Sequence, residues 1–577
     1  MISLLNKDSK TLWERWDSLA QTQPDKTAIV HWRAEGVSFR WSYKHLLEMA
    51  NRYSERLKQL GVKKGDVCAL IIRHNPQFYP LYLGISGIGA LPAVLAYPNP
   101  RLHHEKFQKG LIGMSEKSGL NWIFTERELE RIIKPLIVNR GKVNSGLFFP
   151  LDWELKERVK LKELEELKQI RDSIDENDPM LLQHSSGTTG LQKPIILSHK
   201  AILDHVNNYG KAIQLSGNDI VASWLPLYHD MGLIAAFHLP LAFGITTIQI
   251  DPFEWVLAPS ILLDVITVEK ASLTWLPNFA YNLMADKIKE QELERISLVS
   301  LRMVVNCSEK VRAESHKKFY RKFSDYGLHE NTLATMYAMA ETTLAITQSE
   351  PGKRAVEISV DKNALAQGFV NLTDNPAKSK ICVSSGKPID KCQIKIVNDR
   401  REALSENRVG EIAVKSVSMF QGYRNYPKKT AEVFDSENWF YSGDLGFLHD
   451  SELYVIGRIK DVIIVAGNNI YPEDIEDAAN KIENIISGRV VAFGEEDELL
   501  GTEQVSVVAE TKFDNEIELR KLSMDVIEAG MSANVNIHAV YLVPSRWLIK
   551  SSSGKPSRKI NKQRILDKID RNVWSNR

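Results

Sequence analysis

The stretch QHSSGTTGLQKPIILSH, from Gln183 to His199, is the part of the sequence that decides the fold. It contains small and hydroxyl-bearing residues up to Gly190, then Lys193 and an aliphatic run typical of a strand. Successive backbone N–H groups in such a glycine-rich turn can form an anion-binding concavity, and neighbouring hydroxyls and a lysine add donors. Taken alone, the stretch is also compatible with a mobile surface turn.

The spacing of this stretch excludes a P-loop nucleotide triphosphatase. That motif, G-x-x-x-x-G-K-[ST], leads into a helix. Here Gly187 and Gly190 are too close together, and the residue after Lys193 is a proline that opens a strand-like run. The sequence contains no G-x-S-x-G, H-E-x-x-H or G-x-G-x-x-G motif, so nothing in it supports a hydrolase, a zinc protease or a dinucleotide-binding enzyme.

The composition is that of a folded protein without a strong charge bias. Of the 577 residues, 43% are hydrophobic and 25% are charged, and 74 Lys and Arg stand against 73 Asp and Glu. This balance gives no global attraction to nucleic acid or to an anionic membrane. No CxxC pair or disulfide spacing is present, so free thiols in a reducing compartment are predicted for Cys68, Cys307, Cys382 and Cys392.

Neither a signal peptide nor a membrane span is predicted. The N-terminal residues MISLLNKDSKTLWERW carry charges where a signal peptide needs an apolar core. The longest apolar run, Ile85–Tyr97, is too short and too interrupted by Gly and Pro to cross a bilayer. We therefore expect a soluble, cytoplasmic protein with no nucleic-acid partner and no membrane span.

The first part of the chain is predicted to be a large α/β domain. Helical patterns over Ser42–Leu60 and Gln77–Ile88 alternate with aliphatic runs such as Val67–Ile72. Strands interleaved with helices favour mostly parallel sheets covered by helices on both faces. A Glu- and Lys-rich segment, Trp153–Arg171, is predicted to be a solvated surface helix.

The last part of the chain is predicted to be a small α+β domain. ELYVIGRIKDVIIVAG indicates two short strands around a turn, and NNIYPEDIEDAANKI begins a helix with Pro472 near its first turn. The strand-like runs GRVVAFG, QVSVVAE and IHAVYLV follow, with a helix predicted over Glu516–Ala529. The expected boundary lies at Arg458–Asp461, which gives a large domain of residues 1–459 and a small one of residues 461–577.

The glycine-rich stretch resembles the signature loop of the adenylate-forming superfamily, which includes acyl-CoA synthetases, luciferases and peptide-synthetase adenylation domains. Other motifs of that superfamily follow in its order along nearly the whole chain. They are WLPLYHDMGLI (Trp224–Ile234), VVNCSEKV (Val304–Val311), YAMAETT (Tyr337–Thr343), YSGDLG (Tyr441–Gly446), GRIKD (Gly457–Asp461) and SSSGKPSR (Ser551–Arg558). The resemblance implies an enzyme that uses ATP to convert a carboxylate into an acyl-adenylate, with a mobile C-terminal lid.

The resemblance also implies which residues bind ATP and Mg²⁺. Glu341 would be the magnesium ligand, and one glutamate is adequate because Mg²⁺ fills its shell with phosphates and water. Asp444 would accept hydrogen bonds from the ribose hydroxyls, and Arg458 would assist there. The departing pyrophosphate would be held by Ser185, Ser186, Gly187, Thr188, Thr189, Gly190 and Lys193. Further nucleotide contacts would come from Tyr337, Ala340, Thr342 and, at the adenine, Asn306, Ser308 and Glu309.

Three further residues receive roles from the same resemblance. Lys555 would be the catalytic lysine, which reaches the site from the small domain. Lys460 would be the hinge about which that domain reorients. His229 would lie beside the acyl carboxylate, and a histidine satisfied within the core is the alternative for it.

Five residues depart from the usual pattern of the superfamily. Two of them, Cys307 and Ala338, add side-chain bulk near the expected adenine pocket, which would weaken nucleotide affinity. None of the five removes a group that the chemistry needs. They are Pro194, Cys307, Lys310, Ala338 and Pro556.

The branches of the superfamily differ in what they activate and in what accepts the acyl group. The acceptor is CoA in the CoA ligases and a carrier protein in the fatty acyl-AMP ligases, while a peptide-synthetase domain activates an amino acid. YHDMGLI, LPNFAYNLMADKI and YAMAETTLAIT resemble the fatty acyl-AMP ligases. GKRAVEISVDKNALAQGFVNLTDNPAKSK, residues 352–380, resembles an insertion in those ligases that contacts both domains and disfavours transfer to CoA. A surface loop without consequence is the other interpretation of this segment.

We therefore expect a fatty acyl-AMP ligase that uses ATP and Mg²⁺. It would activate a medium- or long-chain fatty acid and transfer it to the phosphopantetheine of a separate acyl carrier protein, in polyketide or lipopeptide assembly. A long-chain fatty acid–CoA ligase is one alternative. A catalytically degenerate protein that binds acyl chains or nucleotide is another, but the presence of Glu341, Asp444, Arg458 and Lys555 speaks against it.

Overall fold

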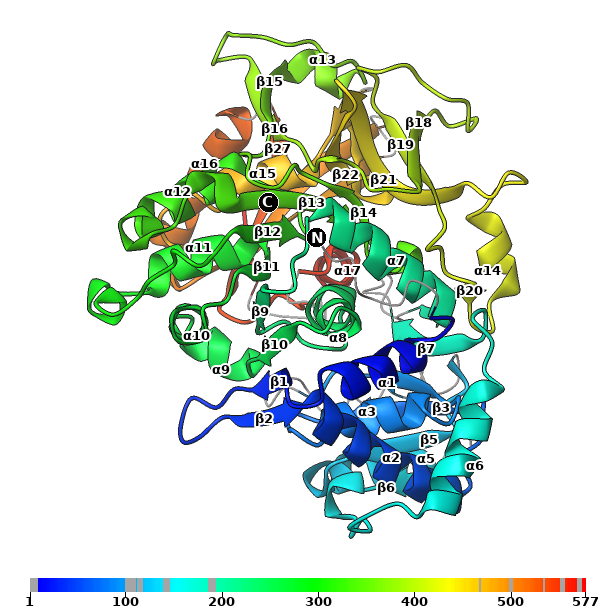
Figure 1. Ribbon diagram of the computed structural model, residues 1–577. Helices are drawn as coiled ribbons and strands as arrows, with labels where there is room; N and C mark the ends of the chain where they lie inside the picture. The colour runs from blue at the N-terminus through cyan, green and yellow to red at the C-terminus, as the bar shows by residue number, and fades with distance from the viewer. Residues whose placement is uncertain are drawn as a thin grey trace.

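A large, mostly parallel β-sheet runs through the centre of the protein, as Figure 1 shows for the computed structural model. Its strand order is β17-β14-β13-β12-β11-β9-β10-β1-β2, and the six strands from β13 to β1 are parallel to one another. The structure describes residues 9–98, 111, 118–138, 146–184, 193–465, 468–497, 502–532, 535–550, 556–567 and 573–576. The strands of this sheet are β1 (Thr27–His31), β2 (Phe39–Ser42), β9 (Ile220–Ser223), β10 (Thr246–Gln249), β11 (Leu273–Pro277), β12 (Met303–Cys307), β13 (Leu333–Ala338), β14 (Ala345–Gln348) and β17 (Lys387–Pro388).

Smaller sheets surround the central one. A parallel sheet in the order β4-β3-β5-β6 consists of β3 (Val67–Ile71), β4 (Leu91–Val94), β5 (Trp122–Thr125) and β6 (Gly146–Phe148). A three-stranded sheet in the order β20-β8-β7 consists of β7 (Pro179–His184), β8 (Pro194–Ser198) and β20 (Gly422–Tyr423). An antiparallel sheet consists of β18 (Cys392–Val397), β19 (Gly410–Ser416), β21 (Phe440–His449) and β22 (Glu452–Arg458), and a hairpin of β15 (Glu357–Asp361) and β16 (Ser379–Val383).

Helices cover the sheets, as the predicted fold class requires. α2 packs on α3 beside the four-stranded parallel sheet, while α10 and α11 contact β9 and β11 of the central sheet. These helices are α1 (Leu12–Thr22), α2 (Tyr43–Leu60), α3 (Phe78–Ser86), α5 (Glu130–Val138), α6 (Leu161–Asp172), α7 (His199–Ala212), α8 (Leu239–Ala242), α9 (Pro252–Leu257), α10 (Ile261–Glu269), α11 (Asn278–Lys287), α12 (Ala313–Phe323), α13 (Lys362–Ala366) and α14 (Pro427–Glu432). A π-helix, η3 (Met231–His238), and short 3₁₀ turns, among them η7 (Ala340–Thr342) and η8 (Ile459–Asp461), complete this part.

The predicted elements near the N-terminus are confirmed. α2 begins where expected, because the Ser42 hydroxyl oxygen accepts a hydrogen bond from the His45 N–H at 3.2 Å and caps the helix. α2 ends at Gly61, whose φ of 96° is a left-handed conformation. β3 and α3 also match the predicted strand and helix.

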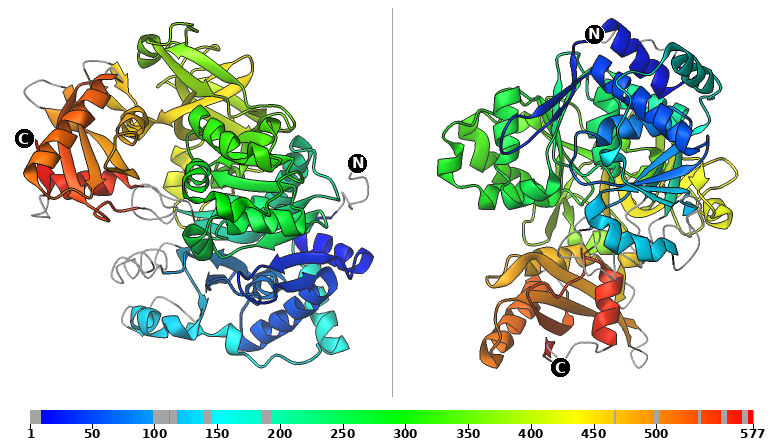
Figure 2. Two further views of the ribbon diagram at one scale, coloured as in Figure 1. Left: turned by 90° about the vertical axis from the view of Figure 1, so that its left-hand side faces the viewer. Right: turned by 90° about the horizontal axis from the view of Figure 1, so that it is seen from below.

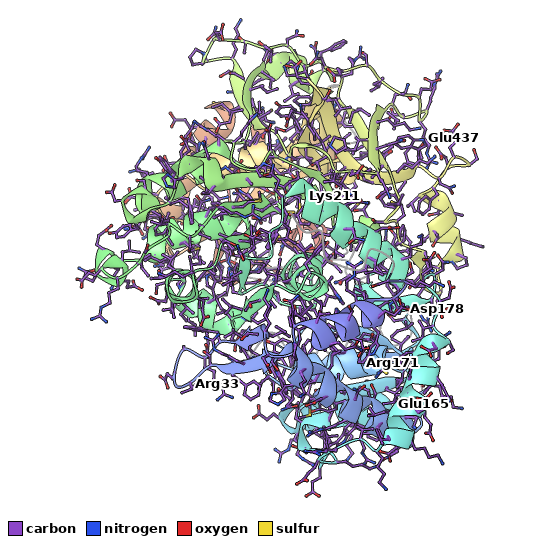
Figure 3. The ribbon with its side chains drawn as sticks, viewed as in Figure 1. Arg33, Glu165, Arg171, Asp178, Lys211 and Glu437 are labelled. Atoms are coloured by element: carbon purple, nitrogen blue, oxygen red, sulfur yellow. The ribbon has the colours of Figure 1, made fainter. Side chains whose placement is uncertain are left out.

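The predicted surface helix over Trp153–Arg171 is only partly right, because α6 begins at Leu161. Residues before it are held by packing of the Trp153 ring, which lies 5.9 Å from the Phe124 ring in an edge-on contact. The C-terminal end of the helix is not merely solvated either. The Arg171 guanidinium lies 3.7 Å from the Trp13 ring centre, and burial lowers the pKa of Arg171 to about 9 (Figure 3). α6 is thus fastened to the N-terminal helices.

The residues after η8 have a core of their own. In Figure 2 they form a lobe beside the main body. A cluster of buried side chains that includes Ile463, Ile475, Val507 and Val540 draws only on residues of this part. Its elements are β23 (Ile463–Val465), β24 (Asn468–Ile470), α15 (Pro472–Ala479), β25 (Ile485–Asp497), β26 (Thr502–Thr511), α16 (Glu516–Ser532), β27 (Ile537–Pro544), α17 (Arg558–Leu566) and β28 (Trp574–Ser575). The predicted helices at Pro472 and Glu516 are confirmed, and the domain limits at Lys460 stay a prediction that this separate core favours.

Two further expectations concern cysteines and membranes. All four cysteines are free and buried. Among the helices of the described residues, none has both the length and the apolar character that crossing a membrane requires.

The tightest glycine contact in the fold generates a stability prediction. Gly386 has a φ of +90°, and a Cβ there would lie 2.0 Å from the backbone carbon of Gln348. Gly352 has a similar φ of +76° but nothing within 4 Å of the added Cβ. We expect Gly386→Ala to lower the free energy of unfolding by about 3 kcal/mol or more, and Gly352→Ala by about 1 kcal/mol, because only the first adds a clash to the backbone strain. Equal losses in thermal or urea unfolding would contradict this account.

Candidate active site

The residues on the two sides of the glycine-containing turn, His184 and Pro194, lie side by side. β7 and β8 are antiparallel neighbours in which His184 pairs with Pro194. Pro194 opens β8, and its carbonyl oxygen accepts a hydrogen bond from the Arg424 N–H at 2.9 Å. The intervening residues fall outside the described part of the chain, so the predicted roles of Ser185, Ser186, Gly187, Thr188, Thr189 and Gly190 stay predictions.

The second residue of the stretch, His184, is a buried, neutral histidine. The His184 Nε2 atom lies 2.8 Å from the hydroxyl oxygen of Ser118. Burial lowers the pKa of His184 to about 4, so its ring is uncharged at neutral pH. Nearby, the Gln183 side chain donates to the carbonyl oxygen of Tyr228 at 2.9 Å. This bond ties the end of β7 to the segment that carries His229.

Glu341, the predicted magnesium ligand, lies in η7 just beyond the carboxyl end of β13. Its carboxylate oxygen Oε1 accepts a hydrogen bond from the Tyr423 hydroxyl at 2.8 Å. Burial raises the pKa of Glu341, and the Tyr423 hydrogen bond and the Lys193 charge oppose that rise, while Asp230 adds to it. The Tyr423 hydrogen bond and the Lys193 charge favour the ionised form that a metal ligand needs, while burial keeps the pKa above its ordinary value.

The donor set around Glu341 fits Mg²⁺ held largely by a substrate. Among the described residues, no group of three or more His, Cys, Asp or Glu side chains could hold a metal ion. Mg²⁺ does not need such a cage, because it is commonly bound by one or two carboxylates together with phosphate oxygens and water. A single buried glutamate beside a lysine is compatible with that mode of binding.

Lys193 and Tyr423 extend the site from Glu341 toward the glycine-rich stretch. The Lys193 ammonium nitrogen lies 3.4 Å from the Tyr423 hydroxyl oxygen and 4.5 Å from the centre of its ring. The sequence predictions include Lys193 and Glu341 but not Tyr423. Its local sequence, GYRN, is ordinary turn sequence, and only the pairing of β20 with β8 brings it to the site.

Asp444, Arg458 and Tyr337 meet at a second point of the site. Asp444 and Arg458 are direct cross-strand partners in β21 and β22, and the Arg458 Nε atom lies 3.1 Å from the Asp444 Oδ1 atom. The Tyr337 hydroxyl donates to the other oxygen of Asp444 at 2.8 Å. The Asp444 charge raises the pKa of Arg458. Each carboxylate oxygen has more than one lone pair, so Asp444 can still accept hydrogen bonds from ribose hydroxyls.

Asn306 lies within β12, and its side chain points into the protein interior, unlike the predicted adenine contacts Ser308 and Glu309 that follow the strand. The Asn306 side chain is fully buried, where its amide nitrogen lies 3.1 Å from the Asn278 Oδ1 atom and 3.0 Å from the His316 Nε2 atom. Ser308 has a left-handed φ of 70°. The Glu309 carboxylate accepts from the Phe279 N–H at 2.8 Å. The predicted adenine contacts of Asn306, Ser308 and Glu309 stay predictions, and for Asn306 they would have to come from its backbone.

Two other predicted nucleotide contacts are buried within η7. The Thr342 hydroxyl oxygen lies 3.0 Å from the Met339 and 2.9 Å from the Leu344 carbonyl oxygen, which compete for its one proton, and the residue is 1% exposed. Ala340 is 6% exposed. Both residues shape the turn that carries Glu341, and their contact with a nucleotide stays a prediction.

His229 lies at the entrance of the π-helix η3. The His229 carbonyl oxygen accepts from the Leu233 N–H at 2.8 Å, and the Asp230 side chain caps the helix through the Met231 N–H at 2.8 Å. π-helical segments are rare and are frequent at functional sites. The Ser308 hydroxyl lies 3.8 Å from the Met231 sulfur, so this helix borders the predicted adenine segment.

Lys460 and Lys550, the residue before the Lys555 segment, lie within electrostatic reach of predicted site residues. Burial, Arg458 and Lys193 lower the pKa of Lys460, while Asp461 and Asp444 oppose them. Residues 551–555 fall outside the described part, so the role of Lys555 stays a prediction. On either side of them Lys550 pairs with Pro556. Burial and Arg489 lower the pKa of Lys550 to about 8, and the charges of Glu510 and Glu309 oppose that shift.

The predicted insertion contains regular secondary structure and is not an irregular loop. β15 and β16 pair as a hairpin, with α13 between them. Val360, Leu365 and Cys382 of this hairpin bury against Phe447 and Tyr454 of the neighbouring sheet, and Tyr471 joins the same cluster from the C-terminal part. The insertion thus contacts residues on both sides of Lys460.

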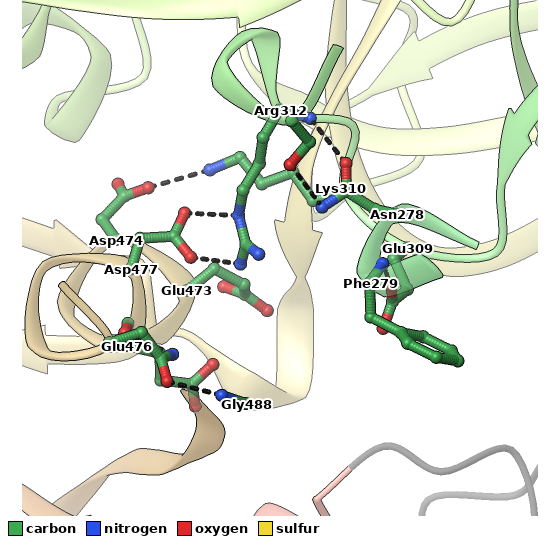
Figure 4. A network of polar contacts seen from close by, with 12 residues as sticks. Asn278, Phe279, Glu309, Lys310, Arg312, Glu473, Asp474, Glu476, Asp477 and Gly488 are labelled. Atoms are coloured by element: carbon green, nitrogen blue, oxygen red, sulfur yellow. Dashed lines mark hydrogen bonds and ion pairs between the residues drawn. The ribbon is translucent and has the colours of Figure 1, made fainter. Parts of the chain in front are cut away.

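Ion pairs join the same parts of the chain (Figure 4). Asp474 in α15 lies 2.8 Å from the Lys310 ammonium, and Lys380 of β16 pairs with the same aspartate. Burial alone would raise the pKa of Asp474, but the two lysines hold it well below its usual range. One turn further, Asp477 accepts from the Arg312 Nε atom at 2.7 Å. Lys310, which departs from the usual pattern, therefore has a structural role.

Comparison with known proteins agrees with these sequence motifs. The profile of the AMP-binding enzyme family matches residues 16–424. The long-chain-fatty-acid–AMP ligase FadD26 of Mycobacterium bovis is 27% identical over 569 residues, which cover 93% of this chain and 94% of FadD26. The medium-chain-fatty-acid–[acyl-carrier-protein] ligase JamA of Moorena producens is 29% identical over 69% of this chain and 70% of JamA. A Caulobacter vibrioides protein, named as a candidate acyl-CoA synthetase, is 28% identical over 89% of this chain and 88% of its own.

Solved structures share the fold over nearly the whole chain. One from a study of fatty acyl-adenylate ligases of E. coli and L. pneumophila has a TM-score of 0.86 at 24% identity and covers 98% of both chains. The L. pneumophila fatty acyl-adenylate ligase in complex with acyl adenylate and pyrophosphate has a TM-score of 0.73 at 27% identity, again over 98% of both chains. The predicted α/β fold class is confirmed.

The ion pairs at α15 generate a testable prediction. Asp474→Asn leaves Lys310 and Lys380, whose side chains are 16% and 13% exposed, without their anion. We expect this to weaken the attachment of the C-terminal part by about 1–3 kcal/mol, because a largely buried charge loses its partner. Limited proteolysis near Lys460 should then be faster. Asp390→Asn, which breaks an exposed pair with Lys211 (Figure 3), is the control and should leave the rate unchanged. Equal cleavage of both variants would contradict the prediction.

Proposed function

This chain belongs to the AMP-binding enzyme family, and from that premise we propose that it is a fatty acyl-AMP ligase. It activates a medium- or long-chain fatty acid with ATP, releases pyrophosphate and transfers the acyl group to the phosphopantetheine of a separate carrier protein. The names of FadD26 and JamA, similar over most of the chain, support this proposal.

One observation carries the adenylation step. Glu341 and Lys193 both contact Tyr423, and the charge of Glu341 also acts on Arg458, which pairs with Asp444. A carboxylate for a metal, a cation for phosphate and a carboxylate for ribose are the groups that an ATP site needs. A degenerate binding protein would not need all of them.

The proposed reaction proceeds in two steps, adenylation of the fatty acid and transfer of the acyl group. A carboxylate oxygen of the fatty acid attacks the α-phosphorus of ATP, and the bond to the β-phosphate oxygen breaks, so that pyrophosphate leaves with the electron pair. The thiol of phosphopantetheine then attacks the acyl carbonyl carbon and gives up its proton, and AMP leaves. The first step needs positioning and charge stabilisation more than covalent chemistry.

The residues of this chain divide that work. Lys193 and the glycine-rich stretch would hold the pyrophosphate, and Lys555 would add a second ammonium from the C-terminal part. Asp444 and Arg458 would orient the ribose, and His229 would lie beside the fatty acid carboxylate. Glu341 would bind Mg²⁺, which neutralises phosphate charge when bound.

The insertion supports a carrier protein rather than CoA as the acceptor. It buries Val360 and Leu365 against the main body and contacts Tyr471 and Asp474 of the C-terminal part. If these contacts form in one orientation of the C-terminal part and break in another, they bias the equilibrium between the two orientations. A difference of about 5 kcal/mol is enough to shift a two-state equilibrium almost completely to one side. A long-chain fatty acid–CoA ligase is the second candidate, which the name of the Caulobacter vibrioides relative favours.

A side-by-side acceptor assay tests the proposal. The protein is mixed with radiolabelled dodecanoate, ATP and Mg²⁺, and then with CoA or with a pantetheinylated carrier protein. We expect acyl-AMP, labelled carrier and no CoA ester, whereas CoA ester without labelled carrier would identify the CoA ligase. Lys555→Ala should slow acyl-AMP formation by roughly two to three powers of ten, the scale of one preorganised charge-stabilising donor. Lys559→Ala, in the same basic segment, is its control.

Removing the insertion should change the acceptor. Deletion of Val356–Ala377 removes β15 and α13, so the bias toward one orientation should fall and CoA-ester formation should rise. Lys380→Gln keeps the hairpin and removes only its cation on Asp474, and it should raise CoA-ester formation less. The midpoint of thermal unfolding shows whether each variant is folded. A folded deletion variant without any gain in CoA ester would contradict the proposed role of the insertion.

A further inference from the structure

We propose that Tyr423 is a positioning residue that holds Glu341 and Lys193 in the geometry needed for the metal–ATP complex. The inference rests on the proposed function, because it takes Glu341 as the metal ligand and Lys193 as a phosphate ligand. It assigns a role to a tyrosine that lies in neither of the motifs carrying those two residues.

The segment around Tyr423 is bonded to the turn that carries Glu341. The Phe420 N–H donates to the Glu341 carbonyl oxygen at 2.8 Å. The Thr343 hydroxyl donates to the Ser418 carbonyl oxygen, also at 2.8 Å. With the hydrogen bond from the Tyr423 hydroxyl to the carboxylate, both the backbone and the side chain of Glu341 are held by the same segment.

The same segment is bonded to β8, the strand in the C-terminal part of the glycine-rich stretch. Tyr423 pairs with Ile195 in the antiparallel register of β20 and β8. On either side of it, the Gln421 N–H donates to the Ile196 carbonyl oxygen at 3.0 Å and the Arg424 N–H to the Pro194 carbonyl oxygen at 2.9 Å. Residues 418–424 therefore bridge the two segments that must act on the same substrate phosphates.

The Tyr423 ring is fixed in place by its surroundings. Tyr423 is 4% exposed, and its ring meets the Phe420 ring edge-on at 4.9 Å. The Tyr423 N–H donates to the Thr430 hydroxyl oxygen at 2.9 Å. Little conformational entropy is lost when such a ring presents its hydroxyl, so the hydroxyl is a preorganised group.

The hydroxyl contacts both charged residues, and its chemistry suits both. A phenol has one proton to donate and lone pairs to accept with. It donates the proton to Glu341 at 2.8 Å and can accept from the Lys193 ammonium at 3.4 Å. A neutral group with these two contacts lets anion and cation stay close without neutralising each other. In its absence the carboxylate and the ammonium could form a direct ion pair, which would compete with the metal and with pyrophosphate.

Tyr423→Phe tests this role, because it removes the hydroxyl and keeps the ring and the backbone bonds. The matched control is Tyr441→Phe, which removes a tyrosine hydroxyl that donates to the Asp435 carboxylate at the same distance, 2.8 Å. Binding of Mn²⁺·ATP is measured without fatty acid from the electron paramagnetic resonance of Mn²⁺. Binding of AMP, which needs no metal, is measured by calorimetry.

We expect Tyr423→Phe to weaken Mn²⁺·ATP binding by about tenfold or more, the scale of one hydrogen bond to a charged group. AMP affinity should stay that of the wild type, which a merely structural role would not allow. Tyr441→Phe should match the wild type in both measurements. Unchanged Mn²⁺·ATP binding, or an equal loss of AMP binding, would overturn the inference.

A third variant separates this inference from the proposed function. If Glu341→Gln binds Mn²⁺·ATP as tightly as the wild type, the proposed metal ligand is wrong and the role of Tyr423 is overturned with it. If Glu341→Gln loses binding while Tyr423→Phe does not, only the role of Tyr423 is overturned and the metal ligand stands.

Discussion

The pairing of partly buried carboxylates is the constraint on which the rest of this structure depends. Glu341, Asp444 and Asp474 are all partly buried, and each has a specific partner from a distant part of the chain. Placing a charge in such a position is costly unless a hydrogen bond or an opposite charge meets it. The segments that supply these partners are therefore held next to the carboxylates, and the partners of Glu341 and Asp444 form the candidate site.

The partners differ in kind, and the difference matches the expected work of each carboxylate. Glu341 has a neutral phenol and a lysine that also contacts that phenol, which leaves the carboxylate room to bind a cation. Asp444 has a phenol and an arginine that together orient both of its oxygens. Asp474 has two lysines, whose charges outweigh its own. The first two fit ligand binding, whereas the third fits attachment between parts of the chain.

Local patterns predicted much of the fold, and long-range contacts account for what they missed. The serine cap of α2 and the proline start of α15 are encoded in a few adjacent residues, so the sequence is sufficient to predict those helices. The segment before α6 has a helical composition, but packing of Trp153 on Phe124 overrides it. Motif resemblance indicated Glu341, Lys193 and Asp444, whereas Tyr423 reaches them only through a two-stranded pairing that no local pattern announces. The inward turn of Asn306 likewise depends on Asn278 and His316, which come from other elements.

The sharing of one aspartate by two lysines has a consequence for how this sequence can drift. Lys310 comes from the segment after β12 and Lys380 from the insertion, yet both meet Asp474. If a related sequence loses one of the two lysines, the other still neutralises Asp474. If it loses the aspartate, both lysines lose this shared partner. Related sequences should therefore vary more at positions 310 and 380 than at position 474, because a substitution of either lysine is tolerated better than a substitution of the aspartate.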